Sequence, residues 1–78
     1  MVGALGRREE ELAATQEAAD TYRELAAARP EEFRDDLVTS LNDLSAELAR
    51  LGRREEAVAA SQEADTIRRE LASREPDV

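Results

Sequence analysis

Apolar residues recur at helical spacing through the middle of this 78-residue chain. Between residues 30 and 51 they follow steps of four and three, which place them on one face of an α-helix. These positions are Phe33, Leu37, Leu41, Leu44, Leu48 and Leu51. Pro30 suits the first position of a helix, and the two glutamates behind it complement the helix dipole. The pattern predicts an amphipathic helix over residues 30–51.

The segments on either side carry smaller side chains. Gly6, Pro30, Gly52 and Pro76 interrupt the chain and predict two more helices, over residues 7–28 and 53–74. The apolar positions of the first are Leu12, Thr15, Ala19, Tyr22, Leu25 and Ala26. Those of the third are Ala57, Ala60, Ala64, Ile67 and Leu71. Because small side chains let helix backbones approach closely, we expect the leucines of the middle helix to pack onto alanine. The predicted fold is all-α, a single unit of three antiparallel helices.

An internal repeat runs through the chain. Residues 5–30 align with residues 51–76 without a gap, and 16 of the 26 aligned positions are identical. Both copies begin with LGRREE, continue through QEA and end at a proline. Repeats of this kind are typical of helical solenoids. We interpret LGRREE as a turn between two helices, in which the leucine ends one helix and the glycine permits the turn.

The charge balance argues against nucleic acid and membrane partners. The net charge is −8, and an acidic chain repels phosphates and anionic lipids. Phosphate binding by the paired arginines of the repeat is the alternative to a solvated turn. These arginines are Arg7, Arg8, Arg53 and Arg54. The longest apolar run, residues 25–28, is too short to cross a bilayer, and no secretory leader opens the chain. We expect a cytoplasmic protein.

Composition also argues against catalysis. The chain has no histidine and no cysteine, which removes the usual near-neutral base and the thiolate nucleophile. All eleven basic residues are arginine, so no lysine is present to activate a hydroxyl group either. The hydroxyl candidates are Tyr22, Ser40, Ser45 and Ser61. We therefore expect no enzyme and no cofactor. The abundance of arginine and alanine is typical of a GC-rich, for example actinobacterial, genome.

Acidic clusters mark the starts of the predicted helices, where carboxylates complement the helix dipole. A divalent-metal site at Asp35 and Asp36 is the alternative, but adjacent residues on a helix point about 100° apart. Asp65 precedes Arg69, and Glu70 precedes Arg74, in the order that favours ion pairs within a helix. These charges therefore predict structural placement rather than a metal centre.

The segment LNDLSAELARLGRREEAVAASQEA, residues 41–64, resembles a tetratricopeptide repeat. Large apolar residues three apart, a small residue, a glycine turn and an EA pair fall at that family's spacings. The LND-LS run is most similar to the longer form of kinesin light chains and of many actinobacterial regulators. The resemblance covers about one and a half repeats. It implies a non-catalytic module for protein–protein contact.

This chain departs from the family pattern at two points. The repeat unit is 46 residues, against about 34, or about 42 in the long form. Glu11 also stands where the second copy has Ala57, the small residue against which the first helix of a repeat packs. A glutamate buried there without a partner would cost several kcal/mol. We therefore expect no such helix over residues 7–28, as in a terminal, excised or designed piece of a longer array.

The resemblance also implies a binding surface, because the first helix of each repeat lines a concave groove that holds peptides. The matching positions are Thr39, Asn42, Asp43, Ala46, Ala49, Arg50 and Arg53. Asn42 is the sharpest candidate, since an amide can both donate to and accept from a peptide backbone. The alternative is a polar residue on the wet face of an amphipathic helix.

Self-association is the other expectation, because the outer helices lack neighbours and a core this small is marginal. The apolar residues that a second copy could cover are Leu5, Leu12, Tyr22, Leu25, Val58, Ile67 and Leu71. A homodimer would use these residues, although Glu11 and Asp65 interrupt the apolar faces. A monomeric scaffold with no ligand of its own remains the alternative.

Overall fold

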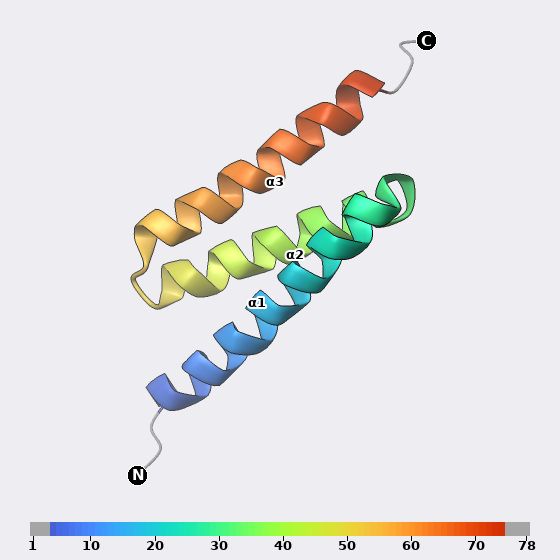
Figure 1. Ribbon diagram of the computed structural model, residues 1–78. Coiled ribbons are helices and arrows are strands. Elements are labelled where there is room, and N and C mark those ends of the chain that lie inside the picture. Colours follow the sequence, from blue (N-terminus) through green and yellow to red (C-terminus); the bar gives the residue numbers. More distant parts are fainter. Residues whose placement is uncertain (1–3, 75–78) are drawn as a thin grey trace.

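The computed structural model describes residues 4–74, which form three α-helices. α1 spans Ala4–Ala28, α2 spans Pro30–Arg50 and α3 spans Arg54–Arg74. Consecutive helices run in opposite directions, and α2 lies between the other two (Figure 1). This confirms the predicted all-α fold of three antiparallel helices.

α2 is the packing partner of both outer helices. It packs against α1 and α3, whereas the backbones of α1 and α3 do not come into contact over the described residues. The molecule is elongated and measures 56 × 22 × 16 Å. Each helix therefore keeps a side that no other helix covers.

The core consists of leucines packed against alanines. α2 contributes Leu37, Leu41, Leu44 and Leu48, and Leu41 is fully buried. The buried apolar residues of the outer helices are Leu12, Ala19 and Ala26 on α1 and Ala57, Ala60 and Ala64 on α3. Small side chains on both outer helices thus meet large ones on α2, as the sequence predicts.

One residue separates α1 from α2. Arg29 leaves the helical conformation, with φ −138° and ψ 75°, because the proline that follows disfavours helical geometry in the residue before it. The Arg29 amide still donates to the carbonyl of Leu25 at 2.7 Å, and Pro30 begins α2. The chain therefore reverses without a loop, which brings the C-terminal end of α1 against the start of α2.

A glycine turn separates α2 from α3. Gly52 has φ +78°, a left-handed conformation that strains any residue with a Cβ atom. The Gly52 amide donates to the carbonyl of Ala49 at 3.0 Å, and the Arg53 amide donates to that of Leu48 at 2.9 Å. This pair of bonds is the Schellman motif, which satisfies the last carbonyls of a helix. The second LGRREE is therefore a turn, as predicted.

The first LGRREE is not a turn, which corrects the sequence-based interpretation. Residues 5–10 lie inside α1, which begins at Ala4 rather than at Arg7. The turn at Gly52 depends on carbonyls of the preceding helix, so the hexapeptide alone does not specify it. Its arginines and glutamates are good helix formers, and they form helix where no such capping bonds are made. The repeated sequence thus adopts two conformations.

Candidate protein-interaction surface

The predicted groove residues lie on the uncovered side of α2 and in the turn that follows it. All of them are exposed to solvent: Thr39, Asn42, Asp43, Ala46, Ala49, Arg50 and Arg53. The leucines of α2 point the other way, into the core. We name this exposed set the α2 face. Its existence follows from the amphipathic period of α2, which leaves polar residues on the side opposite the leucines.

Both arginines of the α2 face are held by neighbouring glutamates. Arg50 donates to Glu47 at 2.9 Å, and Arg53 donates through two nitrogens to Glu56 at 2.9 and 2.8 Å. The hydrogen bonds to Glu56 raise the pKa of Arg53. Solvent screens exposed pairs of this kind, so a ligand carboxylate could displace them at small cost.

The remaining charge on the exposed side of α2 is acidic. The exposed carboxylates are Glu31, Glu32, Asp35, Asp36 and Asp43. Arg29 reaches one of them, Glu32, at 3.3 Å. The exposed side of α2 ahead of the α2 face therefore carries mainly carboxylates, with Arg34 half-buried among them, whereas Arg50 and Arg53 lie at the end of α2 and in the turn after it. A peptide that lies along this face meets carboxylates first, then the Asn42 amide, then two paired arginines.

The candidates for self-association are spread over several environments. Leu12 is 4% exposed and belongs to the core, so it has little surface to offer a second copy. Tyr22 and Ile67 are half-buried against the core, and Leu25 and Leu71 are half-buried as well. Val58 is 53% exposed and is the large apolar residue most open to solvent in the described part of the chain. The side chain of Leu5 lies outside the described residues.

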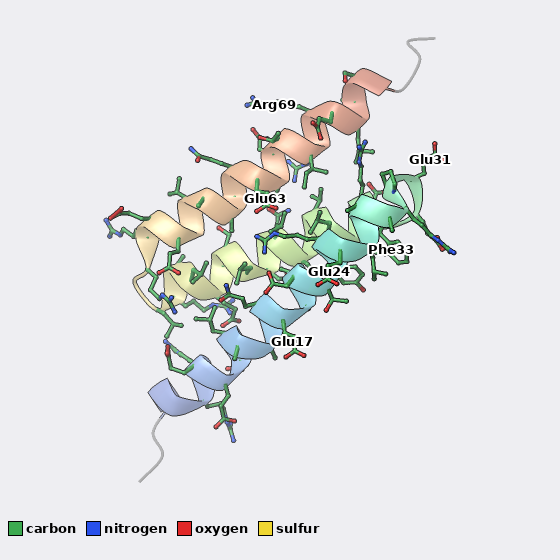
Figure 2. The ribbon with its side chains drawn as sticks, in the orientation of Figure 1. Glu17, Glu24, Glu31, Phe33, Glu63 and Arg69 are labelled. Carbon is green, nitrogen blue, oxygen red and sulfur yellow. The ribbon has the colours of Figure 1, made fainter. Side chains whose placement is uncertain are left out.

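An ion pair between the outer helices was not foreseen from the sequence. Arg23 of α1 donates to Glu63 of α3 through Nε at 2.9 Å and through an η nitrogen at 2.8 Å, and its other η nitrogen contacts Asp20 at 2.6 Å. Figure 2 shows Glu63 projecting from α3 toward the other two helices. This bidentate pair links α1 and α3 directly, although the backbones of the two helices do not come into contact in the described part of the chain.

Arg23 and Glu63 shift each other's pKa values. The hydrogen bonds from Arg23 lower the pKa of Glu63, and the same bonds raise the pKa of Arg23. Both side chains remain more than a third exposed, so solvent screens the interaction. The sequence shows only that Arg23 and Glu63 are charged and that each lies beside the apolar positions of its helix. Such a signal does not identify a partner 40 positions away.

The hydroxyl groups occupy structural positions. Ser45 donates to the carbonyl of Ala57 at 2.8 Å, which ties α2 to α3, and Ser40 is buried in the core. Tyr22 stacks obliquely on Phe33, with ring centroids 6.4 Å apart. Ser61 is exposed.

The geometry does not favour the alternative metal site or the alternative phosphate site. Over residues 4–74 no three acidic side chains converge in a way that could hold a metal ion. Asp35 and Asp36 are both exposed on α2. Of the paired arginines considered for phosphate, Arg7 and Arg8 are exposed on α1 and Arg53 is engaged by Glu56. The predicted ion pair between Asp65 and Arg69 is present at 2.7 Å, whereas the side chain of Arg74 lies outside the described residues.

Comparisons with known proteins do not identify a family. No family model, no curated protein and no solved structure matches this chain. In the part of the chain that the structure describes, no helix has an apolar stretch of the length that crossing a bilayer requires. The resemblance to tetratricopeptide repeats therefore stays a hypothesis based on the residue pattern of positions 41–64.

Proposed function

We propose that this chain is a non-catalytic module for protein–protein interaction, of tetratricopeptide-repeat type, that works in the cytoplasm. One observation carries the proposal: the residues matching the family's peptide-binding positions form one uncovered surface on α2 and its following turn. Helices α1 and α3 flank α2 and hold it in place through the leucine–alanine core. A rigid helix that presents a polar face without a partner suits the capture of an extended or helical peptide.

The charge on this surface favours basic peptides. Most exposed charge along α2 is negative, and complementary charge speeds association and rejects acidic competitors. Asn42 lies beyond these carboxylates, and its side-chain amide can donate to a peptide backbone through the NH2 group and accept from it through the carbonyl oxygen. A peptide with arginine or lysine ahead of a polar segment therefore matches the order of groups on the α2 face.

Peptide titration tests this function. Arginine-rich and glutamate-rich peptides of equal length are titrated into the intact protein by calorimetry, at low and at physiological salt. We expect the basic peptide to bind more tightly, and Asn42→Ala to weaken that binding several-fold. Ser61→Ala, at an exposed position on α3, is the matched control. Equal binding of both peptides, or an equal loss with both variants, would contradict the proposal.

Self-association is the second candidate function, favoured by the apolar surface that the outer helices leave uncovered. Val58 is 53% exposed, and Leu71 is only half-buried on the same helix. A homodimer that covers the exposed side of α3 would bury Val58 through a twofold contact. Sedimentation over a range of concentrations separates a dimer from a monomer, and Val58→Asp should abolish the dimer. If the measured mass stays that of a monomer at every concentration, self-association is rejected.

A further inference from the structure

The two outer helices are related by the repeat, yet they pack on α2 with different faces. The buried and half-buried apolar residues of α3 are Ala57, Ala60, Ala64, Ile67 and Leu71, and the first four belong to the core or pack against it. Displaced by 46 positions, the equivalent residues of α1 are Glu11, Ala14, Ala18, Thr21 and Leu25. We name this second set, together with Glu17 and Tyr22, the outer face of α1. The pattern that makes a helix-binding surface on α3 is therefore present a second time.

Over residues 4–74 no helix covers the middle of this surface, although Tyr22 at its edge stacks on Phe33 of α2. Ala14, Ala18 and Thr21 are exposed, whereas Ala60 and Ala64 at the equivalent positions are 5% and 1% exposed. A shallow depression runs along the outer face. It is lined by Ala14, Glu17, Ala18, Thr21, Tyr22 and Leu25. Figure 2 shows Glu17 projecting from α1 away from α2 and α3.

We propose that the outer face of α1 docks an amphipathic helix from another polypeptide, with a leucine stripe like that of α2. The molecule itself supplies the docking geometry, because α3 uses the equivalent positions to pack against the leucines of α2. Alanines at these positions let the incoming backbone approach closely, and Tyr22 and Leu25 add apolar area at one end. The surface lies on a different helix from the α2 face and acts independently of it.

Glu11 determines the charge of the incoming helix. Its counterpart Ala57 is 7% exposed, and the Ala57 carbonyl accepts the hydroxyl hydrogen bond of Ser45. A helix docked in the same register would place its residue equivalent to Ser45 against the Glu11 carboxylate. Burying that carboxylate without a cation is unfavourable, so an arginine or lysine is required there.

A second carboxylate, Glu17, adds no requirement on the docked helix. Its counterpart Glu63 binds Arg23 of α1 rather than a residue of α2. The partner is therefore a leucine-striped helix with a basic residue near its C-terminal end. The chain's own α2 carries Ser45 at that position, so Glu11 selects against a second copy.

The equivalent argument does not extend to α3. The face by which α1 meets α2 includes Ala19, which is fully buried, and the counterpart of Ala19 is Asp65. Asp65 is already paired with Arg69 at 2.7 Å and lies in the middle of that face. The inference therefore concerns α1 alone.

The test uses two synthetic peptides with the sequence of residues 30–51, one unchanged and one carrying S45R. Each is titrated into the intact protein by calorimetry. We expect the S45R peptide to bind about fivefold more tightly or better, because its arginine meets Glu11. Glu11→Ala in the protein should remove this preference and strengthen binding of the unchanged peptide.

Matched alanine variants locate the site. Ala18→Glu places a carboxylate in the middle of the outer face and should weaken binding of the S45R peptide by about tenfold or more. Ala27→Glu, at an exposed position on the opposite side of α1, should change binding less than twofold, as should Asn42→Ala on the α2 face. Equal affinity of the two peptides, or equal effects of the two glutamate substitutions, would overturn the inference. A loss with Asn42→Ala alone would place the binding on the α2 face instead.

Discussion

α1 and α3 are near copies in sequence and yet face α2 with different sides. α1 buries Leu12, Ala19 and Ala26, whereas α3 buries Ala57, Ala60 and Ala64. None of these positions corresponds to another under the 46-residue offset. A helix of this repeat therefore carries two packing faces, and each outer helix uses one of them. α1, which precedes α2, buries one of these faces, whereas α3, which follows α2, buries the other.

Two carboxylates mark the faces that are left open. Glu11 stands on α1 where α3 has the buried Ala57, and Asp65 stands on α3 where α1 has the buried Ala19. At most other positions on these faces the two copies are identical or similar. Single charged residues thus distinguish an open face from a closed one, because a carboxylate is tolerated only where water or a cation reaches it.

The largest expected effect comes from placing the same substitution at equivalent positions of the two helices. Ala64→Glu puts a carboxylate into a position that is 1% exposed and should destabilise the fold by several kcal/mol. Ala18→Glu is the same change on the exposed face of α1 and should alter stability by less than about 0.5 kcal/mol. Urea unfolding followed by circular dichroism measures both. Similar losses in the two variants would mean that both faces are buried.

Truncating an apolar side chain at equivalent positions tests the opposite case, in which the residue of α1 is buried and that of α3 is exposed. Leu12→Ala removes a core side chain that is 4% exposed and should cost about 2–3 kcal/mol. Val58→Ala, at the equivalent position of α3, should cost less than about 0.5 kcal/mol because Val58 is 53% exposed. The midpoint of urea unfolding reports each change. A large loss from Val58→Ala would indicate that a second copy covers this residue in solution.

The two glycines of LGRREE should respond with opposite signs. Gly52→Ala forces a Cβ atom into a left-handed conformation and should destabilise the protein by about 1–2 kcal/mol. Gly6→Ala lies within α1 and should stabilise it by up to about 1 kcal/mol, because alanine favours the helix. Thermal melting of the two variants under identical conditions tests the pair. A loss with Gly6→Ala would support a turn at the first LGRREE.

The smallest expected effect concerns the ion pair between the outer helices. Glu63→Gln should lower stability at pH 7 by less than about 1 kcal/mol, since both partners are partly exposed. The folded-state pKa of Glu63 is lowered from 4.5, so its contribution is complete above that value and disappears as the pH falls through the lowered pKa. The two proteins should therefore converge in stability at acidic pH. Glu17→Gln, at the exposed counterpart on α1, is the control and should leave stability at pH 7 unchanged.

Much of the fold could be predicted because helix signals in this chain are local. The step pattern of Leu37, Leu41, Leu44 and Leu48 identified the buried face of α2, and Pro30 marked its start. The exposed residues of the α2 face follow from the same period. These predictions needed only the spacing of residues along one helix.

The remaining features depend on contacts between distant segments. The bond between Arg23 and Glu63 joins residues whose proximity is set by two turns and by the packing of α2. The first LGRREE was predicted to be a turn because its letters match the second, but the turn at Gly52 is made by carbonyls of Leu48 and Ala49. Repetition of a sequence does not repeat the partners that give it a conformation.

Methyl contacts measured by nuclear magnetic resonance test the central claim most directly. The account predicts nuclear Overhauser contacts from the methyl groups of Ala19 and Ala64 to leucine methyl groups of α2, because both alanines are buried there. It predicts none from the exposed methyl group of Ala18 to α2 in the free protein. Contacts from Ala18 to those leucines, or their absence from Ala64, would contradict the arrangement in which α1 and α3 present different faces to one shared helix.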